Sequence, residues 1–300
     1  MLPPDTPPFG AFQSIGGRRL WCLHEGAGGP PVVFLPGAGM FGLGYHNVHR
    51  EAAALGTSVL YDRAGTGWSE DAALPRPAHA VADELLALLD ALGVGEPVVL
   101  VGHSLGGLYA RRFAQRHPAR VEGLLLLDPA SEEYAAHLSD EARQFEAMMA
   151  AQPPMTYSEE LVTAWRPVIE QMYAGWPDAL RAANVARHLA PARALVGMHE
   201  SRDVGPLYEE VRAGGALPAV PLLVFTATSI DAAQRMFCPE PVLQAQNAAK
   251  RAANESLARS VPGATHRVLD DASHAMFHLQ RPDAVVAGLR ELRGRIAARP

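Results

Sequence analysis

The chain has 300 residues, of which 48% are hydrophobic and 19% charged, so it can bury the core of one large globular domain with an insertion. A net charge of −6 without a basic cluster gives no basis for a nucleic-acid or anionic-membrane partner, and no apolar stretch is as long as a membrane span. The two cysteines, Cys22 and Cys238, are far apart in the sequence and make neither a disulfide framework nor a C-x-x-C metal site. The first residues lack the pattern of a secretion signal, so we expect a cytoplasmic protein.

The first third of the chain alternates apolar runs typical of buried strands with segments of helical periodicity. A hairpin is predicted at residues 12–25, and the apolar run 32–35 ends at Pro36-Gly37-Ala38-Gly39. A helix at 46–55, a strand at 58–61 and a helix at 80–92 follow. Aliphatic strands that alternate with helices predict a mostly parallel sheet covered on both faces, which is the α/β class.

The stretch at residues 98–114 predicts a nucleophile. Its aliphatic run ends at Gly102 and a helical pattern begins at Gly107, so Ser104 occupies a sharp corner between a strand and a helix. Glycine at positions 102 and 106 leaves room where the two chain segments pass close together, and the helix N-terminus favours negative charge on the serine oxygen. In this context the pattern Gly-x-Ser-x-Gly favours a nucleophile over a plain glycine-rich turn.

The second half of the chain contains a long insertion between two predicted strands. The strand at 121–127 ends at Asp128, and residues 131–216 then contain helical segments, aromatic residues and prolines but no clear strand. The elements predicted after the insertion are a strand at 220–226, a helix at 245–259, a short strand at 267–269 and a helix from Pro282 onward.

Four motifs in this chain together resemble the α/β-hydrolase superfamily, in its serine-nucleophile branch with a helical cap. They are Leu35-Pro36-Gly37-Ala38-Gly39, the segment Asp62 to Ser69, the corner Gly102 to Gly107, and His274 before the last helix. The resemblance covers nearly the whole chain outside the insertion. It implies an α/β-hydrolase fold with core segments at 1–130 and 217–300 and a helical cap at 131–216.

A serine hydroxyl is a poor nucleophile at neutral pH unless a base accepts its proton and a third group orients that base. His274 is the predicted base, because the fold requires the order serine, acid, histidine along the chain. Asp128 and Asp231 both remain open as the acid; the preference is for Asp128, because a strand end fixes a side chain better than the longer loop before Asp231. The Gly-x-x-Asp that often carries the acid in this superfamily is missing after the strand at 220–226.

His278 stands four residues after His274, a spacing that can bind zinc when a third ligand and a glutamate base accompany it. Neither is evident, so no metal is expected.

The resemblance also implies an oxyanion hole and a substrate pocket. The backbone N–H groups of Ala38 and Leu105 are expected to bind the negative oxygen that develops during acyl transfer. Trp165, Tyr173 and Trp176 in the insertion are expected to line an apolar substrate pocket; the alternative is that they pack the cap onto the sheet.

These residues predict a cofactor-independent serine hydrolase that cleaves an ester, lactone or thioester of a small apolar substrate through an acyl-Ser104 intermediate. Among enzymes, the alternative is an acyltransferase or a carbon–carbon bond hydrolase with the same triad. Outside enzymes, the alternative is a small-molecule receptor that retains the pocket. Dehalogenase and epoxide-hydrolase chemistry would call for an aspartate nucleophile, and the serine argues against both.

Overall fold

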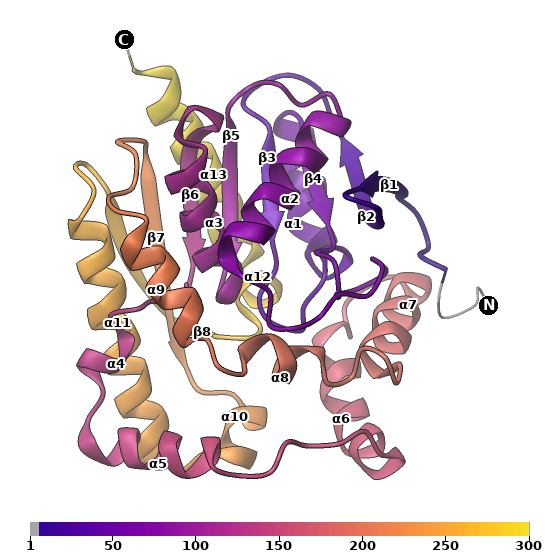
Figure 1. Cartoon of the computed structure of the whole chain (residues 1–300), viewed down its shortest axis with the longest axis vertical. Helices are drawn as coiled ribbons and strands as arrows, with labels where there is room; N and C mark the ends of the chain where they lie inside the picture. Colours follow the sequence, from indigo (N-terminus) through magenta and orange to yellow (C-terminus); the bar gives the residue numbers. More distant parts are fainter. Residues whose placement is uncertain (1–5, 300) are drawn as a thin grey trace.

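The computed structural model describes residues 6–299, and its centre is one eight-stranded sheet (Figure 1). The strands are β1 Ala11–Ile15, β2 Arg18–Glu25, β3 Val32–Leu35, β4 Ser58–Tyr61, β5 Val98–His103, β6 Val121–Leu127, β7 Leu222–Ser229 and β8 Thr265–Ser273. Their order across the sheet is β1-β2-β4-β3-β5-β6-β7-β8. The β1–β2 and β2–β4 pairs are antiparallel, and the other pairs in the described residues are parallel. The predicted mostly parallel sheet is confirmed.

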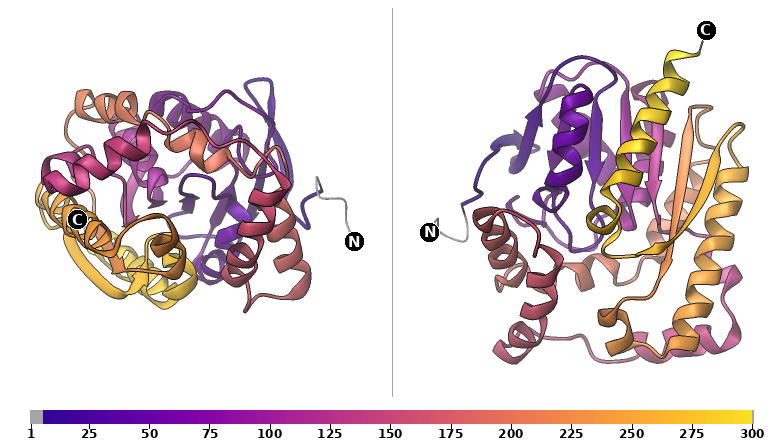
Figure 2. Two further views of the ribbon diagram at one scale, coloured as in Figure 1. Left: turned by 90° about the horizontal axis from the view of Figure 1, so that it is seen from below. Right: turned by 180° about the vertical axis from the view of Figure 1, so that it is seen from behind.

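Helices cover both faces of this sheet. One layer holds α1 His46–Leu55, α12 Phe277–Gln280 and α13 Pro282–Ala297, and the other holds α2 Ala78–Ala91, α3 Leu105–Arg116 and α11 Glu240–Arg259. Figure 1 shows α2 and α3 in front of the strands, and the view from behind in Figure 2 shows α13 on the opposite face. Short 3-10 helices occupy Gly42–Tyr45 and Pro118–Arg120.

The core consists of two large apolar clusters, one on each side of the sheet. Successive side chains of a strand point to opposite faces, so Leu100 joins the cluster beneath α2 and α3, whereas Val99 and Val101 join the cluster beneath α1 and α13. Burial on both faces explains why the central strands are continuous aliphatic runs. In the described part of the chain, no helix is long and apolar enough to cross a bilayer.

The chain between β6 and β7 forms the helical insertion. Its helices are α4 Tyr134–His137, α5 Asp140–Ala150, α6 Glu159–Met172, α7 Asp178–Leu189, α8 Val196–Ser201 and α9 Gly205–Ala213. Figure 1 shows α5 to α8 below the carboxyl ends of the parallel strands, and α9 returns to pack on α2 and α3. The insertion therefore lies at the end of the sheet where the predicted site residues emerge.

Several elements are longer than the sequence predicts. Helix α3 begins at Leu105, directly after the corner serine, and α11 begins at Glu240, where a proline with its fixed φ suits the first turn. Strand β8 continues to Ser273, next to His274. The short helices α10 Ala232–Phe237 and α12 were not predicted, because fewer than two turns show little periodicity. Residues 1–5 and 300, the outer ends of the two predicted core segments, lie outside the described residues.

Candidate active site

The carboxyl ends of four parallel strands bring the predicted chemical groups to one edge of the sheet. Strand β3 leads into the loop 36–39, β5 into Ser104, β6 into Asp128 and β8 into His274. In open α/β sheets this edge is where loops converge on a ligand.

Ser104 occupies a strained turn between β5 and α3. Its backbone angles, φ 51° and ψ −122°, lie in a region that L residues rarely adopt. A Cβ atom at Gly102 would lie 2.6 Å from the Gly107 Cα, and one at Gly106 would lie 2.0 Å from the Leu35 carbonyl oxygen. Only glycine fits at these two positions, and the close approach holds the serine at the first turn of α3.

The Ser104 hydroxyl is hydrogen-bonded to His274, which is in turn hydrogen-bonded to Asp128. Nε2 of His274 lies 2.9 Å from Ser104 Oγ, and Nδ1 lies 2.6 Å from Asp128 Oδ2. Because a carboxylate oxygen only accepts, Nδ1 carries the proton and Nε2 is free to accept the proton of the serine. This is the geometry of a nucleophile, a base and an orienting acid.

Asp231, the alternative acid, is engaged elsewhere. Its side chain accepts the Gln234 backbone N–H at 2.8 Å, and the Gln234 side chain accepts the Asp231 N–H at 3.0 Å. This reciprocal pair is a capping box at the start of α10. Of the two aspartates that the sequence leaves open, the structure brings Asp128 to His274.

Asp128 is fully buried and is shared between a histidine and a lysine. Nζ of Lys250, on α11, donates to the same Oδ2 at 2.7 Å and to the Ala227 carbonyl at 3.0 Å. Burial alone would raise the pKa of the Asp128 carboxyl, but the Lys250 charge and the His274 hydrogen bond outweigh it and hold that pKa well below its usual range. The carboxylate is therefore ionised at neutral pH.

Lys250 is a site residue that the sequence analysis missed. The 26 basic residues of the chain are 25 arginines and this one lysine. A lysine carries a compact charge on a flexible side chain, whereas an arginine carries a planar guanidinium group. In a chain that otherwise uses arginine, the single lysine was therefore a signal that this position has a particular chemical requirement.

A second buried hydrogen-bonded chain supports His274 from the other side. Nε2 of His103 donates to the His274 backbone carbonyl at 2.8 Å, so its Nδ1 accepts from the Tyr45 hydroxyl at 2.6 Å. Burial, assisted by repulsion from the His274 ring, lowers the pKa of His103 to about 3. The ring stays neutral, and this pattern of donors and acceptors is maintained at neutral pH.

His278 contacts Tyr45 and the backbone of Gly44. Its ring stacks on Tyr45 with centroids 3.8 Å apart, and its Nε2 donates to the Gly44 carbonyl at 3.0 Å. Across residues 6–299, no group of three or more His, Cys, Asp or Glu side chains is placed to hold a metal ion.

Backbone donors without partners lie beside Ser104. A Cβ atom at Gly37 would lie 3.2 Å from the Ser104 Cβ, so the loop after β3 passes directly over the serine. No acceptor within the described residues binds the Ala38 N–H, and Leu105 begins α3, where first-turn N–H groups lack helical partners. Free donors at these positions are able to bind a negative oxygen formed at the serine.

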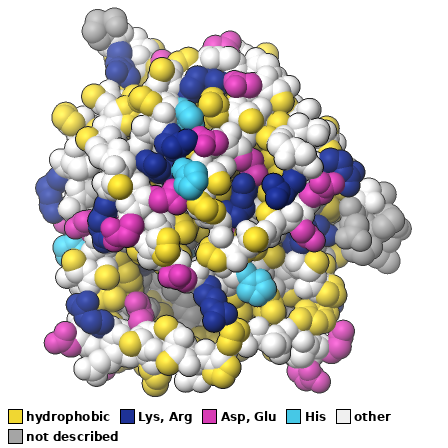
Figure 3. Space-filling view, viewed as in Figure 1, with side chains coloured by type: hydrophobic (Ala, Val, Ile, Leu, Met, Phe, Trp, Pro, Cys, Tyr) yellow, Lys and Arg dark blue, Asp and Glu magenta, His cyan; other side chains and the backbone are white. Residues whose placement is uncertain are grey.

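A cavity of about 160 Å³ opens next to Ser104. Ser104 and His274 line it together with residues from the end of β6, the insertion and α11: Asp128, Pro129, Ala130, Ser131, Tyr134, Tyr208, Lys250, Ala253 and Asn254. Figure 3 shows this face of the molecule hollowed below α8 and α9. A volume below the roughly 300–1,000 Å³ of drug-sized sites suits a small substrate group.

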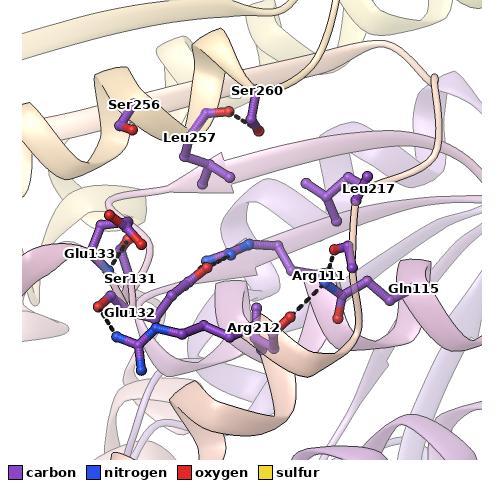
Figure 4. Close-up of a pocket in the computed structure, with 13 residues that line it drawn as sticks. Arg111, Gln115, Ser131, Glu132, Glu133, Arg212, Leu217, Ser256, Leu257 and Ser260 are labelled. Atoms are coloured by element: carbon purple, nitrogen blue, oxygen red, sulfur yellow. Dashed lines mark hydrogen bonds and ion pairs between the residues drawn. The ribbon is translucent and has the colours of Figure 1, made fainter.

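A second, polar cleft of about 270 Å³ lies on the other side of Ser131 (Figure 4). Two of its charged groups are paired, since Arg111 binds both carboxylate oxygens of Glu132, and Arg212 donates to the Glu132 carbonyl. Neither Ser104 nor His274 lines this cleft.

The three cap aromatics expected to bind substrate do not line the Ser104 cavity. Trp165, Tyr173 and Trp176 lie instead in an apolar cluster formed by α6, α7 and the turn between them. Tyr173 is fully buried, its hydroxyl is 3.0 Å from His188 Nε2, and its ring meets Trp176 edge-to-face at 5.1 Å. This arrangement matches the packing alternative.

Replacing Tyr173 by leucine is therefore expected to lower the free energy of unfolding by about 2 kcal/mol, because it leaves a void and removes the partner of His188. The order of preference among ester substrates should stay the same. Urea unfolding and a substrate panel measure the two effects, with the half-buried Trp165→Leu as a milder companion. A changed preference at unchanged stability would place this cluster on the substrate path instead.

A sequence model described as the alpha/beta hydrolase family matches residues 32–288. The chain is 31% identical over 267 residues to the pimeloyl-[acyl-carrier protein] methyl ester esterase of Chromobacterium violaceum, covering 86% of this chain and 92% of that protein. It is 30% identical over 176 residues to a haloalkane dehalogenase of Sphingobium indicum, covering 56% of this chain and 57% of that protein.

The solved structure of a thermophilic esterase from Thermogutta terrifontis has a similar fold, with a TM-score of 0.61 at 22% identity, covering 96% of this chain and 99% of that one. The region matched by the family model runs from β3 into α13 and holds Ser104, Asp128 and His274. The chain therefore belongs to the alpha/beta hydrolase family.

Proposed function

We propose that this protein is a cofactor-independent serine hydrolase that cleaves an ester, lactone or thioester bond of a small apolar substrate. The observation that carries the proposal is the hydrogen-bonded series Ser104, His274 and Asp128 beside a small cavity. Membership of a hydrolase family and an esterase among the relatives support the same reaction class.

In the proposed reaction, Ser104 Oγ attacks the carbonyl carbon of the substrate while His274 Nε2 takes the hydroxyl proton. The carbonyl oxygen becomes negative and accepts hydrogen bonds from the Ala38 and Leu105 N–H groups. The imidazolium then protonates the leaving oxygen or sulfur, the acyl bond breaks, and the acyl group stays on Ser104. A water molecule deprotonated by His274 attacks this ester, which releases the acid and restores the serine.

Asp128 and Lys250 set the charge around the base in this scheme. The Asp128 carboxylate stabilises the imidazolium in both halves of the reaction. The Lys250 ammonium keeps the carboxylate ionised and balances its charge, so the pair together contributes no net charge to the resting site.

We also propose that residues 1–130 and 217–300 form the catalytic core and that residues 131–216 form a cap over it. The serine, the acid and the base all come from the two core segments. The insertion supplies Tyr134 and Tyr208 to the wall of the cavity. Differences in substrate preference between this chain and its relatives would then arise from the cap.

A fluorophosphonate probe, which phosphonylates activated serines, tests the proposal together with a panel of small esters, lactones and thioesters. Wild type should gain one probe mass at Ser104 and turn over at least one class of substrate many times per site. Ser104→Ala should do neither, whereas Ser260→Ala, which replaces an exposed serine, should behave as wild type. A folded wild type that is neither labelled nor active on any substrate would contradict the proposal.

Product analysis distinguishes the related reactions. Release of the free acid with water as acceptor indicates hydrolysis, whereas capture of the acyl group by an added alcohol at low concentration would indicate acyl transfer. A single slow cycle that ends with a modified Ser104 would indicate a receptor.

A further inference from the structure

Glu200, on α8 of the insertion, places a buried carboxylate against the loop that carries Ala38. The side chains of Glu200 and Arg63 are only 2% and 1% exposed. Oε2 of Glu200 accepts the Gly39 N–H at 2.8 Å, and its two oxygens accept three hydrogen bonds from Arg63 at 2.8, 3.0 and 3.1 Å. The carboxylate thus binds the loop and Arg63 at the same time.

Arg63 extends this contact to the peptide groups next to Ser104. Its Nη1 donates to the Pro36 carbonyl at 2.6 Å, and its Nη2 donates to the Gly37 carbonyl at 3.1 Å. The Gly37 carbonyl and the Ala38 N–H belong to one planar trans peptide group and point in opposite directions. A guanidinium that holds this carbonyl therefore fixes the direction of the Ala38 N–H.

Helix α8 also touches the loop through backbone alone. Gly39 has a φ of 71°, and a Cβ atom there would lie 2.7 Å from the Gly197 Cα. In the reverse direction, a Cβ atom at Gly197 would lie 3.3 Å from the Gly39 Cα. Because the two backbones are this close, the first turn of α8 packs directly on the loop with no side chain between them.

A buried ion pair is a costly way to attach a cap, because desolvation of both charges consumes most of the attraction between them. Apolar contacts would hold the cap equally well. The pair has one consequence that apolar contacts would lack: if α8 leaves, Arg63 loses its counter-ion and the Gly39 N–H loses its acceptor. Fewer hydrogen bonds then fix the orientation of the loop.

We infer that Glu200 and Arg63 are positioning residues that aim the Ala38 N–H at the oxyanion while α8 is seated on the loop. The inference rests on the proposed function, because it assigns the loop its part in acyl transfer. It makes the insertion a contributor to transition-state stabilisation and more than a wall of the cavity. Loss of a single oxyanion donor in a serine hydrolase costs about 10²- to 10³-fold in kcat. This factor sets the scale of the decrease in kcat expected when the donor points away from the oxyanion.

Glu200→Gln keeps the size of the side chain and removes its charge. We expect kcat on an ester that wild type hydrolyses to fall about 10- to 100-fold, with KM changed less than about threefold, because the donor acts mainly on the transition state. Affinity for a trifluoromethyl ketone, which adds to a catalytic serine as a tetrahedral oxyanion, should fall by the same factor. A purely structural role would lower the melting temperature and leave both constants unchanged per folded site.

Glu132→Gln is the matched control, because Glu132, in the cleft of Figure 4, also binds an arginine through both oxygens, and within residues 6–299 it makes no hydrogen bond to the loop. It should lose stability and keep kcat and ketone affinity within about twofold. If Glu200→Gln behaves like Glu132→Gln, the inference is wrong.

Gly197→Ala gives a second test if Glu200→Gln does not fold, since its methyl group would lie 3.3 Å from the Gly39 Cα and would shift α8 relative to the loop by a few tenths of an ångström without changing any charge. It should also lower kcat and ketone affinity, and unchanged values would overturn the inference. Ser104→Ala distinguishes failure of the inference from failure of the proposed function: turnover close to that of wild type in this variant contradicts the proposed function. If Ser104→Ala is inactive but Glu200→Gln keeps the kcat and ketone affinity of wild type, only the positioning role is contradicted.

Discussion

Alanine at Ser104 or at His274 is expected to lower kcat/KM about 10⁴- to 10⁶-fold while the fold stays intact. In the proposed reaction, Oγ receives the acyl group, and His274 Nε2, 2.9 Å away, removes the serine proton, so the loss of either atom stops this route. Both side chains lie outside the apolar clusters of the core, so melting temperature and circular dichroism should remain close to wild type. Steady-state hydrolysis of the best substrate in the panel measures the loss.

The double variant provides the control for this prediction. Residues that act as one unit are not additive, so Ser104→Ala with His274→Ala should be within a few-fold of the worse single variant. A double variant that loses far more than either single one would show that the two side chains contribute separately and would contradict the triad.

Asparagine at position 128 should lower turnover about 10⁴-fold at neutral pH, whereas asparagine at position 231 should lower it less than about twofold. An amide at 128 can donate to Nδ1 of His274 and so favour the tautomer whose Nε2 carries a proton and cannot act as a base. At 231 an amide oxygen still accepts the Gln234 N–H, and asparagine caps helices as well as aspartate does. Both variants are assayed side by side at saturating substrate.

A large loss only in Asp231→Asn would reverse the assignment, and a small loss in both would mean that a third group orients His274.

Stability as a function of pH gives an independent check of the charge on Asp128. The folded pKa of Asp128 lies below the value of about 3.9 for an exposed aspartate, so its ionised form stabilises the native state above about pH 4. That contribution is lost as the pH falls through the folded pKa. The difference in melting temperature between wild type and Asp128→Asn should therefore shrink below about pH 4.

The turn that carries Ser104 could be predicted because it is a local property of the chain. The steric demands at Gly102 and Gly106 appear directly in the sequence pattern, and the structure shows backbone atoms where side chains would otherwise be. The choice between Asp128 and Asp231 could not be made locally, because both follow a strand and the partner of His274 depends on which loop reaches it. One local signal was available: Asp231 is followed three residues later by Gln234, which is the pattern of a capping box.

Contacts between distant segments left no such signal. Glu200 and Arg63 are 137 residues apart, and nothing near either residue indicates the other. The cap aromatics show the same limit. The sequence identifies Trp165 and Tyr173 as large apolar groups, but whether they face a ligand or each other depends on how α6 packs on α7. A stretch without strands could be predicted for a simpler reason, since strands stop at Leu127 and resume at Leu222.

The single lysine also provides a proteolytic probe of the proposed active site. A protease that cuts only after lysine has one target bond in these 300 residues, and that bond follows Lys250 within α11. Cleavage requires the helix to unwind locally and the contact of Nζ with the Asp128 carboxylate to break. The rate of this one cut would therefore report how often the acid side of the site opens in the unmodified protein, and a ligand that closes the site would slow it.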